Sequence, residues 1–434
     1  MELAKKVTTF IKSHKYYVVV LTASLLLIGF LYYTKIYQNR KEYVVEYSSN
    51  GFKPNVLTVA KGDTVSFKNL SEEDFWPASD PHPLHSLYSK FDPKKPIPPG
   101  SVWSFRADKI GSWNFHDHLF PAFRGKLSVL SKKDFEIKNR NLKRDEIIAM
   151  IKGDPLKTYN TLKSIYDPST SFAHSVFHLY GEVLYDKFGL SAIEYCDSFA
   201  GFGCYHGFFI RAVSEKGVGV AIELDRTCLE KYGPTGLGCP HGIGHGLVEY
   251  FGLGKIAEPL EVCQKLNWKG PLFGCASGVF MENNFPTVFD KNGVGKVTTR
   301  EAHGNLFEPC LTKAGAFKTT CYFEQASWWN EILGGNFTQI GKYCNSLKAI
   351  NEKESCLLGA GNTAAETSSY SADKVTEACS VMGSEFSTAV CRTGGAWAFF
   401  ANPDKRVEAE NICSGLGIYE TYCLNKYILV KENE

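Results

Sequence analysis

Four histidines between residues 82 and 118 have the residue type and spacing of a metal site: His82, His85, His116 and His118. Imidazole nitrogens bind Cu²⁺ and Zn²⁺, and the carboxylate of Asp117 would add a hard oxygen ligand. On a strand, His116 and His118 would share one face while Asp117 pointed to the other. Either these two histidines bind a metal together, or Asp117 binds it with one of them.

A second group of histidines lies between residues 174 and 245: His174, His178, His206, His241 and His245. The first two and the last two are each four residues apart, which places each pair on one helical face. Such pairs are ligands in zinc metalloproteases, but the His-Glu-x-x-His motif of those enzymes is absent from this sequence. The five histidines are therefore a candidate second metal site. The alternative is that they only satisfy carbonyl groups at helix ends.

All fourteen cysteines follow residue 195, and they fall into seven consecutive pairs. An even number of regularly spaced cysteines predicts disulfides, which persist in oxidising compartments. The spacing differs from the short CxxC pairs of zinc ribbons, although zinc binding stays open. Bonds within the pairs and bonds between adjacent repeats also stay open. The pairs are Cys196/Cys204, Cys228/Cys239, Cys263/Cys275, Cys310/Cys321, Cys344/Cys356, Cys379/Cys391 and Cys413/Cys423.

The second cysteines mostly recur at steps of about 35 residues, which is typical of a solenoid of helical pairs. Most copies contain Cys-x-x-Gly, and a glycine one turn after the cysteine would let two helices approach closely. His178-Leu-Tyr-Gly181 would be a cysteine-free first copy, and residues 285–303 would be an insertion. In stacked repeats, equivalent positions such as His206 and His241 stand side by side. Residues 149–434 thus predict an all-α repeat domain, similar in architecture to cysteine-stapled relatives of tetratricopeptide-type repeats.

Short alternating segments predict strands between residues 43 and 67, at 102–106 and at 125–130. Several short strands at this spacing favour a β-sandwich. Residues 131–148 are charged and contain few large apolar residues. We expect them to form a linker that runs into a helix.

Three motifs occur in order within residues 43–130: Gly51-Phe-x-Pro, Gly62-Asp-Thr-Val and Gly111-x-Trp-x-Phe. Together they resemble the cupredoxins of the plastocyanin and azurin type, a resemblance that implies a Greek-key sandwich and a copper site. In that register His85 matches the first histidine ligand of the family. Asp117 stands where the family has its cysteine, and Phe123 where it usually has methionine.

The absence of both sulfur ligands has a consequence for the expected site, because blue colour and fast electron transfer depend on the copper–thiolate bond. We expect a thiolate-free site made of His85, His116 and His118, with His82 or Asp117 as the fourth ligand. The cofactor expected from the resemblance is copper, with zinc as the alternative.

Residues 16–34 contain an uncharged apolar run, Tyr16 to Tyr33, that is long enough to cross a bilayer. No small-x-small cleavage site follows it, so we expect an uncleaved anchor after a flank at residues 1–15. With disulfides in the rest of the chain, this predicts a single-pass membrane protein. Its N-terminus would be cytoplasmic and its bulk extracytoplasmic.

The expected protein is multidomain, with a transmembrane helix, a cupredoxin-like sandwich at residues 43–130 and a disulfide-rich helical repeat domain. Its expected function is copper handling, or less readily electron transfer. One alternative is an interaction protein whose helical repeats bind a protein partner, and another is a metalloenzyme that uses the histidines of residues 174–245. A net charge of only +2 gives no reason to expect nucleic-acid binding. The sequence has no nucleophile elbow, phosphate loop or dinucleotide fingerprint, so no enzymatic activity is assigned.

Overall fold

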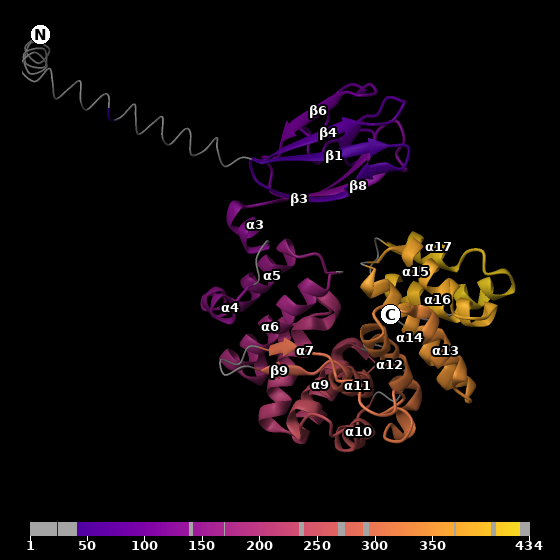
Figure 1. Ribbon diagram of the computed structural model, residues 1–434. Coiled ribbons are helices and arrows are strands. Elements are labelled where there is room, and N and C mark those ends of the chain that lie inside the picture. Colours follow the sequence, from indigo (N-terminus) through magenta and orange to yellow (C-terminus); the bar gives the residue numbers. More distant parts are fainter. Residues whose placement is uncertain are drawn as a thin grey trace, which may run out of the picture. The chain divides into compact units, whose positions relative to one another are not determined.

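The computed structural model describes residue 24 and residues 41–138, 142–168, 170–233, 238–267, 274–289, 295–368, 370–400 and 405–425. The chain divides into two compact units, residues 1–141 and 142–434 (Figure 1). The first contains the β-strands of the predicted sandwich, and the second is helical and contains every disulfide. The boundary between them falls inside the predicted linker.

The first unit contains two four-stranded sheets, with strand orders β2-β1-β4-β6 and β3-β8-β7-β5. The β1/β4 and β3/β8 pairs are parallel, and the other neighbouring strands are antiparallel. The predicted strands are confirmed, and 102–106 coincides with β6. The strands are β1 (Glu42–Ser48), β2 (Gly51–Lys53), β3 (Val56–Ala60), β4 (Thr64–Asn69), β5 (Pro77–Ser79), β6 (Val102–Arg106), β7 (Gly111–Asp117) and β8 (Arg124–Leu130).

The core of the first unit is aromatic and follows from the alternation of apolar residues along the strands. Phe67 on β4 and Phe115 on β7 are buried, and their rings meet edge to face with centroids 5.5 Å apart. Because successive side chains on a strand point to opposite faces, Phe115 and Asp117 share one face of β7, and His116 takes the other. This alternation positions the histidines discussed below.

The predicted linker at residues 131–148 contains one helix and runs into a second, as expected. Helix α3 (Lys132–Lys138) belongs to the first unit, where Lys138 Nζ donates to Thr58 Oγ1 on β3 at 2.6 Å. Helix α4 (Arg144–Ile151) begins the second unit, with Glu146 accepting from the backbone N–H of Lys143 at 3.0 Å.

In the second unit a row of inner helices packs in chain order, each on the next (Figure 1). These are α6 (Ser171–Phe188), α7 (Phe199–Lys216), α9 (Gly238–Phe251), α11 (Gly274–Asn284), α12 (Lys318–Ile332), α14 (Ile350–Thr367) and α16 (Glu385–Phe400). Most of the remaining helices alternate with them: α5 (Pro155–Ile165), η1 (Leu190–Tyr195), α8 (Val218–Tyr232), α10 (Ala257–Cys263), η3 (Gly315–Phe317), α13 (Phe337–Ser346), α15 (Ala372–Ser380), α17 (Arg406–Cys413) and η5 (Gly417–Tyr419).

Seven disulfides join the cysteines within each consecutive pair, and no cysteine is free. Four of them tie the second cysteine on an inner helix to the preceding outer helix, as Cys228 on α8 is tied to Cys239 on α9. The alternatives of bonds between repeats and of zinc binding by cysteines are therefore wrong.

Glycines one turn after these cysteines bring the inner helices into backbone contact, as predicted. A Cβ added to Gly207 on α7 would lie 1.8 Å from the carbonyl oxygen of His178 on α6. Gly181, in the cysteine-free first copy, has the same relation to Cys204, at 2.0 Å from its carbonyl oxygen. No side chain fits at either position without separating the helices.

The predicted insertion at residues 285–303 contains a two-stranded antiparallel hairpin of β9 (Thr287–Phe289) and β10 (Gly295–Val297). Apart from Ser24, the predicted anchor and its flank lie outside the described residues. Within the ranges that the structure describes, no helix is both long enough and apolar enough to cross a membrane.

Candidate metal centre

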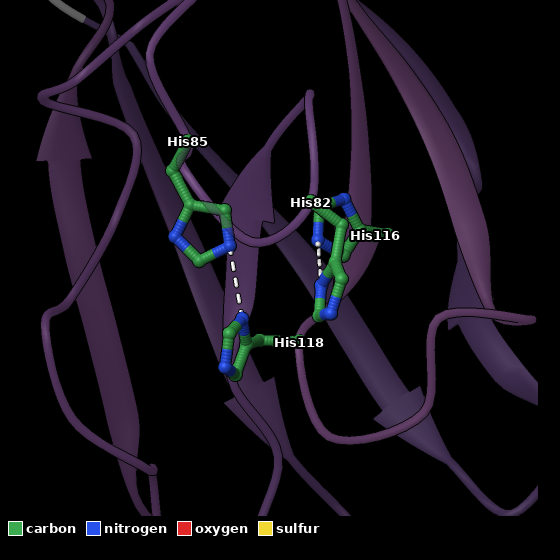
Figure 2. A group of neighbouring side chains, drawn as sticks. All are labelled: His82, His85, His116 and His118. Carbon is green, nitrogen blue, oxygen red and sulfur yellow. Dashed lines mark hydrogen bonds between the residues drawn. The ribbon is translucent and has the colours of Figure 1, made fainter.

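Four histidines converge at one end of the β-sandwich, and we call this group the sandwich site: His82, His85, His116 and His118 (Figure 2). One ring nitrogen from each lies within 4.8 Å of the others. His116 comes from β7 and His118 follows that strand directly, whereas His82 and His85 come from the loop after β5. Figure 2 shows the four rings facing one another in two pairs.

Two carboxylates fix the orientation of two of these rings. His85 Nδ1 lies 2.7 Å from Asp92 Oδ2, and His116 Nδ1 lies 2.7 Å from Asp80 Oδ1. An ionised carboxylate only accepts hydrogen bonds, so each Nδ1 carries the proton and each Nε2 presents a lone pair to the site. Metal-binding histidines are commonly oriented in this way.

Asp92 is held ionised by its surroundings. Burial alone would raise the pKa of this carboxyl, but hydrogen bonds from Lys94, Trp76 and His85 outweigh burial and hold the pKa well below its ordinary value. The Trp76 indole N–H donates to Asp92 Oδ1 at 2.8 Å. Asp92 therefore presents a negative charge to His85.

The other two rings complete the group. His118 Nδ1 lies 3.0 Å from His85 Nε2, and His82 Nδ1 lies 3.2 Å from His116 Nε2. Without a metal, His118 and His82 can donate these hydrogen bonds from Nδ1. If their protons move to Nε2 instead, four lone pairs point into one space, and the group becomes a set of neutral imidazole ligands.

Burial also favours the neutral imidazoles that a metal requires. It lowers the pKa of His116, more than the charge of Asp80 raises it. It lowers the pKa of His118 as well, with further lowering by His85 and His82. Four neutral imidazoles, with no sulfur and no carboxylate among them, fit Cu²⁺ or Zn²⁺.

Asp117 lies outside the sandwich site. Its carboxylate accepts hydrogen bonds from the Tyr47 hydroxyl at 2.5 Å, from the Trp76 backbone N–H at 2.9 Å and from the Leu119 backbone N–H at 3.0 Å. Of the two candidates for the fourth position, the geometry brings His82 to the other histidines and directs Asp117 to the opposite face of β7. Phe123 packs against Tyr47, with ring centroids 6.0 Å apart.

Asp80 and Asp92 are the residues of this site that the sequence did not identify. Asp80 lies two residues before His82, which is a weak signal, and Asp92 lies in a loop without periodicity. Asp80 contacts His116 on β7, and Asp92 contacts His85 within the loop, so both contacts arise only when the loop takes its folded shape.

The five histidines of the second unit form two groups that share His206. The first group, which we call the α6/α7 triad, is His174, His178 and His206; the second is His206, His241 and His245. In each group the ligand nitrogens lie within 4.8 Å of one another. His206 and His241, at equivalent repeat positions, do stand side by side, with ring centroids 5.0 Å apart. The five do not converge on a single point.

Three of these histidines, His174, His206 and His241, lie in an environment that disfavours their charged forms. Burial is the main cause that lowers the pKa of His174 to about 4 and the pKa values of His206 and His241 well below their ordinary value. Neighbouring imidazoles lower them further. Burial therefore favours the neutral form of these three rings.

The sequence matches no protein-family profile and no curated protein. Among solved structures there are weak matches to cupredoxins. A purple cupredoxin from Nitrosopumilus maritimus is 13% identical, with 20% of this chain and 97% of that chain covered and a TM-score of 0.17. A mutant plastocyanin of fern is 20% identical, covering 20% and 99% of the two chains with a TM-score of 0.18. A Cu(I) amicyanin mutant is 18% identical, covering 20% and 81%, also with a TM-score of 0.18.

Proposed function

We propose that this protein binds copper at the sandwich site and handles copper ions outside the cytoplasm. The observation that carries the proposal is the convergence of four imidazole nitrogens, two of them oriented by buried or half-buried carboxylates. Copper rather than zinc is favoured by the sequence resemblance to cupredoxins. In this proposal the first unit is a cupredoxin-like domain that has exchanged its sulfur ligands for imidazoles.

The ligand set favours copper storage or transfer over rapid electron transfer. A copper–thiolate bond is the feature that gives cupredoxin sites their colour and speed, and every cysteine of this chain is in a disulfide in the other unit. Four imidazoles hold Cu²⁺ in a tetragonal or flattened arrangement, which Cu⁺ does not prefer. A change of oxidation state would therefore require a rearrangement of the ligands.

The extracytoplasmic location is supported by the seven disulfides, because such bonds persist in oxidising compartments. Membrane attachment through residues 16–34 is part of the same proposal and is supported by the length of the apolar run.

The test is metal analysis and Cu²⁺ EPR on the full chain, loaded with one equivalent of copper. We expect a wide hyperfine splitting, coupling to ligand nitrogens and no strong visible band. The double variant His85→Ala, His118→Ala should lose this signal, whereas His303→Ala should keep it because His303 lies exposed beside Glu301. The proposal fails if the double variant binds the first equivalent as tightly as the wild type.

A further inference from the structure

The α6/α7 triad differs from the sandwich site because backbone carbonyls fix two of its rings. His174 Nδ1 lies 2.8 Å from the carbonyl oxygen of Ala200. A carbonyl oxygen only accepts, so His174 carries its proton on Nδ1 and presents a lone pair at Nε2. His206 Nε2 lies 3.2 Å from the carbonyl oxygen of Gly238. By the same argument, His206 presents a lone pair at Nδ1.

These two lone pairs face each other. His206 Nδ1 lies 3.4 Å from His174 Nε2, and neither atom carries a proton in the neutral rings. No hydrogen bond can join them, so the contact is repulsive unless a cation lies between them. Two nitrogens that each lie about 2.0–2.1 Å from a tetrahedral zinc ion are about 3.3 Å apart, close to the separation found here.

His178 supplies a third nitrogen. It lies four residues after His174 on the same face of α6, and its Nδ1 approaches Glu182 Oε1 at 3.5 Å. Arg144 Nη1 holds the other oxygen of Glu182 at 3.0 Å. With its proton directed to Glu182, His178 has its Nε2 lone pair available. Its side chain remains 17% exposed, so an ion can reach the triad from this side.

Backbone strain lies directly beside the triad. Ala200, Gly201 and Phe202 have φ values of 52°, 61° and 62°, a left-handed turn within α7. Each non-glycine residue in this region costs about 1–3 kcal/mol, and such residues persist where the surroundings fix them, often around ligands. This turn aims the Ala200 carbonyl at His174. Gly203 and Gly207 then let α7 lie against α6.

His241 and His245, the other members of the second group, are satisfied without a metal. His245 Nδ1 lies 2.6 Å from Glu282 Oε2, which leaves Nε2 as an acceptor for His241 Nε2 at 3.0 Å. His241 Nδ1 lies 3.0 Å from the Ser277 hydroxyl, which is hydrogen-bonded in turn to Glu324. Because His241 donates to His245 from Nε2, its Nδ1 accepts from the Ser277 hydroxyl, and this hydroxyl accepts in turn from Glu324. Glu324 has a proton to donate because burial raises the pKa of its carboxyl to about 8. The carbonyl oxygens beside the triad carry no proton, so no such chain can satisfy the lone pairs of His174 and His206.

We propose that His174, His178 and His206 bind one Zn²⁺ ion through His174 Nε2, His206 Nδ1 and His178 Nε2. This is a second metal site in the helical unit, separate from copper binding by the sandwich site. Three neutral imidazoles suit a divalent ion of the zinc class, and the fourth position is open to water on the side of His178.

The test uses the full chain with its disulfides intact and the background variant His85→Ala, His118→Ala, which removes the sandwich site and leaves the helical unit unchanged. This protein is dialysed against Zn²⁺ and analysed for bound metal, and Co²⁺ is used as a coloured probe of coordination. We expect it to retain about one Zn²⁺ per chain. Adding His178→Ala, or separately His206→Ala, should weaken Zn²⁺ binding at least about 100-fold.

The matched control is His245→Gln, which removes a buried histidine of the neighbouring group and should leave Zn²⁺ affinity within about threefold. His178→Ala changes a partly exposed side chain, so its far-UV circular dichroism should match that of the background protein. The inference is overturned if the background protein binds no Zn²⁺. It is also overturned if His245→Gln weakens binding as much as His178→Ala, because the site would then be the second group.

Discussion

The Asp117 carboxylate accepts a hydrogen bond from the Tyr47 hydroxyl at 2.5 Å, although Asp117 stands in sequence between two histidines of the sandwich site. The two residues are 70 positions apart, on β7 and β1, and both are buried. Asp117 thus joins one sheet of the sandwich to the other.

This relationship predicts that Tyr47→Phe destabilises the sandwich without removing its metal. The substitution leaves a buried charged oxygen with one donor fewer, which costs about 1–3 kcal/mol. Unfolding of the first unit, followed by tryptophan fluorescence in denaturant, measures the loss, and metal analysis should give an unchanged copper content. Tyr43→Phe, on the same strand but only half-buried, is the control and should have a smaller effect. Loss of copper in Tyr47→Phe would contradict the separation of Asp117 from the site.

A second prediction concerns the carboxylate that orients His85. In Asp92→Asn the amide can place an N–H opposite His85 Nδ1, which would move the imidazole proton to Nε2 and block the lone pair. Substitution of such an orienting group typically weakens metal binding about 10–100-fold. Competitive titration of Cu²⁺ against a chelator measures this loss. Asp74→Asn makes the same change at an exposed position and should bind copper like the wild type; equal affinities for the two variants would rule out the orienting role.

The strands of the first unit and the helices of the second were predicted better from the sequence than the contacts around the histidines. The alternation of apolar and polar residues predicted β6 and β8, and the regular spacing of the cysteines predicted the helical unit. Both patterns are local and repeat many times. Alternation also separated His116 from Asp117 correctly. The orienting residues Asp80 and Asp92 were not identified, because loops have no periodicity and their contacts depend on how the loop folds over β7.

The repeat register shows the same limit in the helical unit. Equivalence of positions placed His206 beside His241, and it also places Ser277 beside His241, at 3.0 Å between Oγ and Nδ1. It did not show that the carbonyls of Ala200 and Gly238 would divide the five histidines into two groups. That division depends on the left-handed turn at the start of α7. The repeat spacing of about 35 residues does not indicate this turn.

A third prediction tests the close packing of the inner helices. A Cβ on Gly361 of α14 would lie 1.7 Å from the carbonyl oxygen of Cys391 on α16, so Gly361→Ala must push the two helices apart. We expect a loss of about 1–3 kcal/mol or more in the free energy of unfolding of the helical unit. Far-UV circular dichroism in denaturant measures it. Gly219→Ala is the matched control, since no atom lies within 4 Å of its added Cβ, and it should change stability by less than about 1 kcal/mol.

A fourth prediction concerns Glu324, which occupies the position that most repeats give to glycine. Burial raises the pKa of this carboxyl from 4.5 to about 8, although its hydrogen bond with Ser277 opposes the change. Between these two values the folded protein holds a proton that the unfolded chain has released. The protonated Glu324 therefore contributes fully to the free energy of unfolding below about pH 4.5, and this contribution is lost as the pH rises through about 8.

The free energy of unfolding of the helical unit should accordingly fall between about pH 5 and about pH 8, by at most about 1.4 kcal/mol per pH unit from this group. Glu324→Gln keeps a neutral side chain of the same shape and should flatten this dependence, as measured by denaturant unfolding at several pH values. Glu331→Gln, an exposed position on the same helix, should keep the wild-type slope. If Glu324→Gln also keeps it, Glu324 is ionised in the folded protein. The Ser277 hydroxyl would then donate to Glu324 and accept from His241, so that His241 Nε2 and His245 Nε2 would face each other as two lone pairs.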